Sequence, residues 1–153
     1  MRGGMTRKKR ADVFSKRKRS EIMRAVKGRD TAPERAIRKA LHARGFRYRL
    51  NDNRLPGSPD LVFPKRGAVL FVHGCFWHGH DCARGTRVPK SNARYWREKI
   101  ARNVKRDAEV VAALRRMGWR VKISWECDLH QLEREANKIA GWLLVSVKKG
   151  RTP

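Results

Sequence analysis

Long apolar runs, acidic side chains and cysteines are all scarce in this chain of 153 residues. No apolar run approaches the roughly 18 residues that a membrane span needs, and the amino-terminal sequence lacks the apolar segment of a signal peptide. We therefore expect a cytoplasmic protein without a membrane partner. Its three cysteines are too few, and odd in number, for a disulfide framework, which favours thiolate chemistry or metal binding.

The scarcity of acidic residues leaves a large positive charge. Asp and Glu number 14 against 39 Lys and Arg, so the formal net charge is +25. Positive charge spread along a whole chain suits a polyphosphate such as DNA or RNA better than a small acidic substrate. Because 40% of the residues are apolar, a purely disordered basic tail is excluded. We expect a folded, nucleoid-associated protein that binds nucleic acid.

The distribution of charge and the length suggest three segments. Residues 1–18 form a basic arm that we expect to be flexible, residues 19–147 form a single domain, and residues 148–153 form a basic tail. Helices are predicted at 20–26, 31–45, 92–117 and 132–144, and strands at 46–50, 60–63, 68–73 and 119–125. Strands interleaved with helices predict an α/β fold, with a mixed sheet and helices on its faces.

One predicted hairpin brings a carboxylate beside a neighbouring strand. A turn centred near Arg66 would pair strands 60–63 and 68–73 antiparallel and place Asp60 opposite Val72 and His73. A carboxylate, a backbone carbonyl and phosphate oxygens together suit Mg²⁺. The alternative is that the Pro-Asp pair only shapes a turn.

The three cysteines and one histidine form a candidate metal site. Cys75, His80, Cys82 and Cys127 supply the donors of a closed tetrahedral zinc site, although the C-x4-H-x-C spacing is not the usual knuckle. The alternative is three small buried residues. His78 is another candidate ligand, but a loop that aims His80 at the metal leaves His78 free.

Two further carboxylates and several aromatic side chains have alternative interpretations. Asp107 falls within an apolar helical stripe and needs a partner, either an arginine or one of His73 and His78. Glu34 occupies the reciprocal position of a capping box, so it either only caps the helix or has a catalytic role. The aromatic residues form either a small core or a surface that stacks on bases; they are Phe76, Trp77, Tyr95 and Trp96.

Several strings, in order along the chain, resemble the very-short-patch repair (Vsr) endonucleases. They are Met23-Arg24-Ala25, Arg29-Asp30-Thr31-Ala32-x-Glu34, Leu55-Pro56-Gly57-x-Pro59-Asp60, His73-Gly74-Cys75-Phe76-Trp77-His78-x-His80-x-Cys82, Tyr95-Trp96-x-Glu98-Lys99-Ile100, Asn103-Val104-x-Arg106-Asp107, and Trp119-Arg120-Val121 through Trp125-Glu126-Cys127. The resemblance implies a restriction-endonuclease-like fold with a structural zinc site. It also implies a monomer that nicks double-stranded DNA 5′ of the T in a T:G mismatch left by 5-methylcytosine deamination, with Mg²⁺, alongside mismatch-repair proteins.

The resemblance also implies individual roles. Asp60 and the Val72 carbonyl would bind Mg²⁺, His78 would be the general base oriented by Asp107, and His73 and Glu34 would belong to the active site. Cys75, His80, Cys82 and Cys127 would bind zinc. The residues implied to contact the mismatch are Met23, Phe76, Trp77, Trp96, Lys99 and Asn103.

Some positions depart from the family pattern. Val72 replaces a threonine, while Gly79 and Asp81 replace histidines of the loop, which favours His80 as the ligand. The competing classes are a zinc-stabilised DNA-binding protein without catalysis and a basic RNA- or ribosome-associated protein. Both explain the charge, but neither explains a carboxylate such as Asp107 in an apolar stripe.

Overall fold

The computed structural model describes residues 17–18, 20–21 and 28–145. Most of the basic arm and of the predicted helix at 20–26, together with Met23 and the tail, lies outside the described residues. The main elements are α2 (Ala32–Ala43), β1 (Arg49–Leu50), β2 (Leu61–Phe63), β3 (Ala68–His73), α3 (Ala93–Arg116), β4 (Arg120–Trp125) and α4 (Leu132–Leu144). None of the helices in these described ranges is long and apolar enough to span a membrane.

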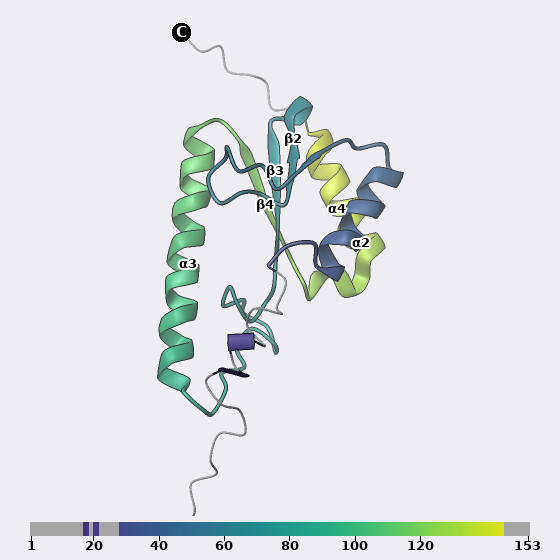
Figure 1. Ribbon diagram of the computed structural model, residues 1–153. Helices are drawn as coiled ribbons and strands as arrows, with labels where there is room; N and C mark the ends of the chain where they lie inside the picture. The colour runs from purple at the N-terminus through teal and green to yellow at the C-terminus, as the bar shows by residue number, and fades with distance from the viewer. Residues whose placement is uncertain (1–16, 19, 22–27, 146–153) are drawn as a thin grey trace, which may run out of the picture.

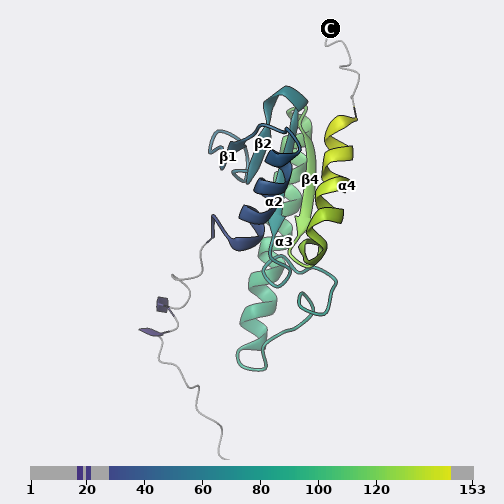
Figure 2. The same ribbon diagram turned by 90° about the vertical axis from the view of Figure 1, so that its right-hand side faces the viewer.

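The strands form a mixed sheet, as predicted. Their order is β1-β2-β3-β4, with antiparallel pairing except between β3 and β4, which run parallel. Helix α3 lies along one face of the sheet, while α2 and α4 cover the other (Figures 1 and 2). The amino-terminal half of α3 extends beyond the sheet, beside the long loop that follows β3 (Figure 1).

Strand β3 lies between β2 and β4, and both of its faces are covered. Ala68 and Leu70 belong to the core formed with α2 and α4, whereas Val69 and Phe71 belong to a second core with Leu114 of α3. Alternation along the strand sends successive side chains to opposite faces. This double coverage explains why 68–72 is an uninterrupted apolar run.

The strand predicted at 46–50 is wrong for most of its length, since only Arg49–Leu50 pairs with β2. The preceding residues instead close the end of α2. The Phe46 N–H donates to the Leu41 carbonyl, and the Phe46 ring is buried in the core. The Tyr48 hydroxyl donates to the Arg38 carbonyl at 3.0 Å. Packing against the helix therefore replaces ladder pairing at this point.

The register predicted for the hairpin is also wrong. Leu61 pairs with Leu70, so the continued register places Phe71, rather than Val72 or His73, opposite Asp60. The cause is a one-turn 3-10 helix, Pro64–Arg66, followed by Gly67 in the left-handed region, which shifts the centre of the turn. The Asp60 side chain nevertheless reaches the next residue and accepts a hydrogen bond of 2.7 Å from the Val72 N–H.

Candidate active site

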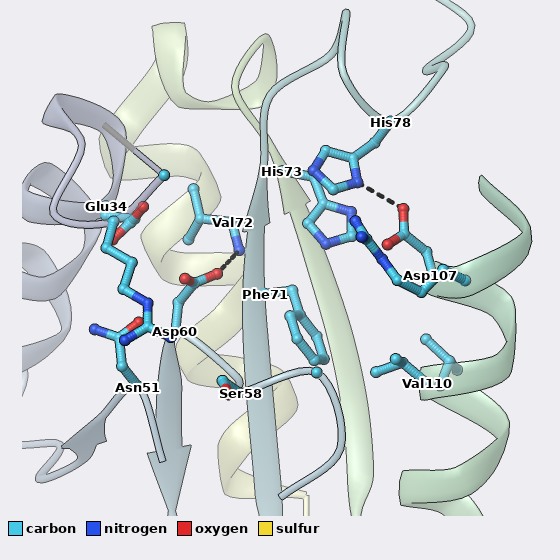
Figure 3. A pocket seen from close by; sticks show the side chains of 15 residues that line it. Glu34, Asn51, Ser58, Asp60, Phe71, Val72, His73, His78, Asp107 and Val110 are labelled. Carbon is cyan, nitrogen blue, oxygen red and sulfur yellow. Dashed lines mark hydrogen bonds and ion pairs between the residues drawn. The ribbon is translucent and has the colours of Figure 1, made fainter. Parts of the chain in front are cut away.

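A cleft of about 480 Å³ collects the predicted catalytic side chains. Glu34 comes from α2, Asp60 immediately precedes β2, His73 ends β3, Asp107 comes from α3, and His78 lies in the loop after β3. Figure 3 shows Glu34 and Asp60 on one side of β3 and the two histidines with Asp107 on the other. The loop before β2 approaches α3 closely because Gly57 has no side chain: a Cβ there would lie 2.5 Å from Val110 Cγ1.

Asp107 pairs with His78, which resolves the alternatives left by the sequence. His78 Nδ1 lies 2.6 Å from Asp107 Oδ2, and about a fifth of each side chain is exposed. An ionised carboxylate can only accept hydrogen bonds, so the proton of the neutral imidazole belongs on Nδ1. His78 Nε2 then carries a lone pair that can accept a proton.

His73 stacks on His78 and remains uncharged. The ring centroids are 3.8 Å apart and the planes differ by 10°. Burial, with a smaller effect from the neighbouring His78, lowers the pKa of His73 to about 4. Its Nδ1 atom is buried and has no hydrogen-bond partner among the described residues. His73 therefore offers the cleft a neutral, unpaired polar atom.

The surroundings of Asp60 in this cleft alter its protonation. Burial raises its pKa to about 6, against the opposing effect of the Val72 N–H hydrogen bond. The negative charge of Glu34 raises this pKa further. Burial disfavours the ionised form of such a carboxylate, and a bound cation would stabilise it.

Glu34 both takes part in the helix cap and lines the cleft, the two roles between which the sequence did not decide. Thr31 caps α2 by accepting from the Glu34 N–H, and the buried Glu34 carboxylate accepts from the Asp30 N–H at 2.9 Å. The same carboxylate is 3.0 Å from Arg38 Nη2 and lines the cleft beside Asp60. The capping interaction thus fixes a carboxylate at the edge of the site.

The predicted zinc ligands come together in space. One donor atom each from Cys75, His80, Cys82 and Cys127 lies within 4.8 Å of the others. A Cβ at Gly85 would lie 1.8 Å from the His80 carbonyl oxygen, so glycine allows this loop to fold back on itself.

The protonation of these thiols fits a cation at their centre. Burial raises the pKa of Cys75, and burial together with the Cys75 side chain raises that of Cys127 to about 12. The Gly85 N–H hydrogen bond lowers the pKa of Cys82 to about 7. Three crowded thiols that resist joint ionisation become thiolates once a divalent ion neutralises their charge. His78 stays outside this set.

An aromatic cluster lies beside the cleft, composed of Phe76, Trp77, Tyr95 and Trp96. Neighbouring rings meet edge to face, with centroids 5.1 to 5.9 Å apart. Lys99 Nζ lies 5.6 Å from the ring centroids of both Trp77 and Trp96. Asn103 Nδ2 donates to the Trp77 carbonyl at 2.8 Å. The mismatch-contacting residues predicted within the described part of the chain therefore form one group.

Some lining residues were missed by the sequence analysis. Arg29, Asn51, Ser58 and Arg106 also line the cleft. Arg106 immediately precedes Asp107, so its place beside a carboxylate in the apolar stripe of the helix was the available signal. The other three lie in loops whose course no local pattern specifies.

Comparison with known proteins assigns the family. A family model described as DNA mismatch endonuclease Vsr matches residues 11–84. The type II nicking enzyme V.XorIIP of Xanthomonas oryzae pv. oryzae is 50% identical over 121 residues, covering 79% of this chain and 88% of that protein. DNA mismatch endonuclease Vsr of Escherichia coli is 44% identical over 124 residues, covering 81% of this chain and 79% of that protein. The chain belongs to the Vsr family of DNA mismatch endonucleases.

Membership of the Vsr family makes the protein an endodeoxyribonuclease, a hydrolase that acts on DNA. A second nicking enzyme, V.NmeAIP of Neisseria meningitidis serogroup A, is 46% identical over 118 residues, covering 77% of this chain and 84% of that protein. The family therefore decides against the non-catalytic DNA-binding protein and the RNA-associated protein considered above. The resemblance drawn from the sequence motifs is confirmed.

Proposed function

We propose that this Vsr-family protein nicks one strand of double-stranded DNA on the 5′ side of the T in a T:G mismatch, and so initiates very short patch repair. It acts as a monomer on the product of 5-methylcytosine deamination, alongside mismatch-repair proteins, and its layered α/β architecture supports a restriction-endonuclease-like fold. The observation that carries the proposal is the His78–Asp107 pair, 2.6 Å apart, in the same cleft as the buried carboxylate of Asp60.

His78 acts as the general base. The attacking water gives a proton to His78 Nε2 as its oxygen bonds to phosphorus, the bond to the leaving oxygen breaks, and the leaving oxygen takes a proton from solvent water. Asp107 holds the proton on Nδ1 and stabilises the imidazolium that forms. Stacked His73 fixes the plane of the His78 ring and, being neutral, adds no charge that would disfavour this protonation.

Asp60 and the Val72 carbonyl would hold Mg²⁺ against the scissile phosphate. The bound ion would neutralise charge that develops on the phosphate oxygens. The raised pKa of Asp60 fits this role, because a bound cation would stabilise the ionised carboxylate that burial disfavours. Glu34, fixed by the Asp30 N–H and Arg38, adds a second negative charge at this edge of the cleft.

The aromatic cluster supports recognition of a mismatch. We propose that Phe76, Trp77 and Trp96 insert between base pairs, which costs least where pairing is already weakened. Lys99 and Asn103, which contact Trp77, hydrogen-bond the mismatched bases. Met23, assigned to the opposite side of the duplex, lies outside the described residues.

Zinc has a structural role in this proposal. Cys75, His80 and Cys82 belong to the loop after β3, and Cys127 follows β4, so a zinc ion held by them would tie this loop to the sheet. The same loop carries His78 and part of the aromatic cluster. These four ligands would therefore preorganise both the general base and the surface that contacts the mismatch.

The proposal is tested with strand-labelled duplexes that differ by one base, T:G against T:A. In the presence of Mg²⁺ the T strand of the mismatched duplex should be nicked 5′ of the T, and omission of Mg²⁺ should abolish the reaction. Equal cleavage of both duplexes would overturn the assigned substrate, and full activity without divalent ions would overturn the assigned metal.

A further inference from the structure

A second cleft of about 390 Å³ continues from the active site toward the aromatic cluster. Both clefts are lined by Glu34, Val72, His73 and His78. The second cleft has walls of its own, formed among others by Trp77, Lys99 and Glu126. A duplex that places its scissile phosphate in the active site and a mismatch at the aromatic cluster must therefore pass this second cleft.

Glu126 is a carboxylate that the proposed mechanism leaves unused. It follows β4, and its N–H donates to the His73 carbonyl at 2.9 Å, which anchors the backbone beside the active site. Arg84 Nη1 donates to Glu126 Oε1 at 3.0 Å. The hydrogen bonds within residues 28–145 engage Oε1 only. The other oxygen, Oε2, lies 3.9 Å from where a Cβ of Gly74 would stand, and Trp77 Cδ1 lies 3.2 Å from the same point.

The remaining carboxylates that line the two clefts have partners inside the protein. Glu34 accepts from the Asp30 N–H, Asp60 from the Val72 N–H, and Asp107 pairs with His78. A half-buried carboxylate close to DNA is repelled by the phosphates, and a hydrogen-bond donor on a base would offset that cost. Glu126, with one oxygen already fixed by Arg84, is arranged for such a donor.

The four bases differ in the hydrogen-bond donors and acceptors that they present to such a carboxylate. In the major groove cytosine presents the N4 amino donor alone, whereas adenine places the N7 acceptor beside its N6 donor. Guanine presents the acceptors N7 and O6, and thymine presents O4. A carboxylate can only accept, so every base except cytosine brings an acceptor toward it.

We propose that Glu126 is a specificity-determining residue that accepts a hydrogen bond at Oε2 from the N4 amino group of a cytosine adjacent to the mismatch. Arg84 positions the carboxylate through Oε1. This inference rests on the proposed function and adds to it a preference for the base beside the mismatch.

The experiment removes the two partners of this hydrogen bond separately and together. T:G duplexes are prepared with cytosine placed in turn at each position flanking the mismatch, and then with 2-pyrimidinone, which lacks the amino group, at the preferred position. Wild-type protein should bind the cytosine duplex about tenfold more tightly than the 2-pyrimidinone duplex, as expected for one hydrogen bond to a charged group. Glu126→Ala should reduce the ratio to about one, and Glu126→Gln should give an intermediate ratio because one neutral acceptor remains.

Glu98→Gln is the matched control. Glu98 also pairs with an arginine, since Arg94 Nε lies 2.9 Å from its Oε1, but it lines neither cleft. This variant should keep the wild-type ratio. Zinc content per chain is measured for each variant, and if Glu126→Ala loses zinc the Gln variant decides.

Two results would overturn the inference: no cytosine preference at any flanking position in the wild type, or a wild-type ratio in the Glu126 variants. Binding is measured by competition without divalent ions, so it does not depend on cleavage. If the wild type nicks no T:G duplex, the proposed function fails while the binding ratios still decide the role of Glu126.

Discussion

Replacing Asp60 with asparagine should stabilise the metal-free protein at neutral pH while abolishing nicking. The pKa of Asp60 rises from 3.8 to about 6 on folding, so the folded state binds this proton more tightly than the unfolded state. The stabilisation that Asp60 contributes is therefore fully present below pH 3.8 and is lost as the pH rises through about 6. A difference of about two pH units corresponds to about 3 kcal/mol.

Asparagine avoids this cost because it is neutral and keeps an oxygen that can accept from the Val72 N–H. At pH 7 we expect Asp60→Asn to unfold at a higher urea concentration than the wild type, because its free energy of unfolding is larger by about 3 kcal/mol. This difference in stability should shrink toward zero near pH 4. Tryptophan fluorescence without divalent ions reports the transition. A variant less stable than the wild type at pH 7, or a gain independent of pH, would refute the reasoning.

Asp52→Asn is the control for this experiment, since it makes the same chemical change at a carboxyl group whose pKa is lowered rather than raised. Hydrogen bonds from Arg54 lower the pKa of Asp52 to about 2. Its stabilising contribution is present above pH 3.8 and is lost as the pH falls through about 2. Asp52→Asn should therefore lower stability at pH 7, where Asp60→Asn raises it.

Four further perturbations test separate parts of the account. Asp107→Asn should slow single-turnover nicking less than removal of His78, because it weakens the base without deleting it; equal rates for Asp107→Asn and wild type would argue against orientation by this carboxylate. Cys127→Ser should lower bound zinc and the melting temperature, measured by elemental analysis and calorimetry. Trp77→Ala should lower the preference for T:G over T:A in competition binding, whereas a purely core role would lower stability and keep the preference. Deleting residues 1–18 should reduce the salt dependence of DNA binding, by about 0.9 in log–log slope per lost phosphate contact, without changing mismatch preference.

The helices were predicted closely because their signals are local. The strands were predicted less accurately because their pairing depends on residues distant in the sequence. The bounds of α3 and α4 agree with prediction to within one residue, because the apolar periodicity of a helix is a local signal. The strand predicted at 46–50 failed because Phe46 and Tyr48 pack against α2, a contact that alternation along the sequence cannot express.

The site was predictable where composition or periodicity restricted the choice. Asp107 stood out as a carboxylate in an apolar stripe, but its partner depended on the path of the loop that carries His78. The candidate metal ligands followed from using every cysteine of the chain together with one histidine, and the structure brings their donor atoms within 4.8 Å of one another. The pairing of Glu126 with Arg84 was not predicted, because it joins two loops 42 residues apart in sequence.

The most direct test of the central claim compares chemistry with binding at the cleft. Single-turnover nicking of a T:G duplex is measured with Mg²⁺ for the wild type, Asp60→Ala and His78→Ala, and the affinity of each for the same duplex is measured without Mg²⁺. Both variants should lose nicking, His78→Ala by about 10²- to 10⁴-fold. Asp60→Ala should bind as tightly as the wild type or more tightly, because a negative charge near a phosphate is removed, and His78→Ala should bind about equally. Nicking by His78→Ala at the wild-type rate would contradict the assignment of His78 as the base.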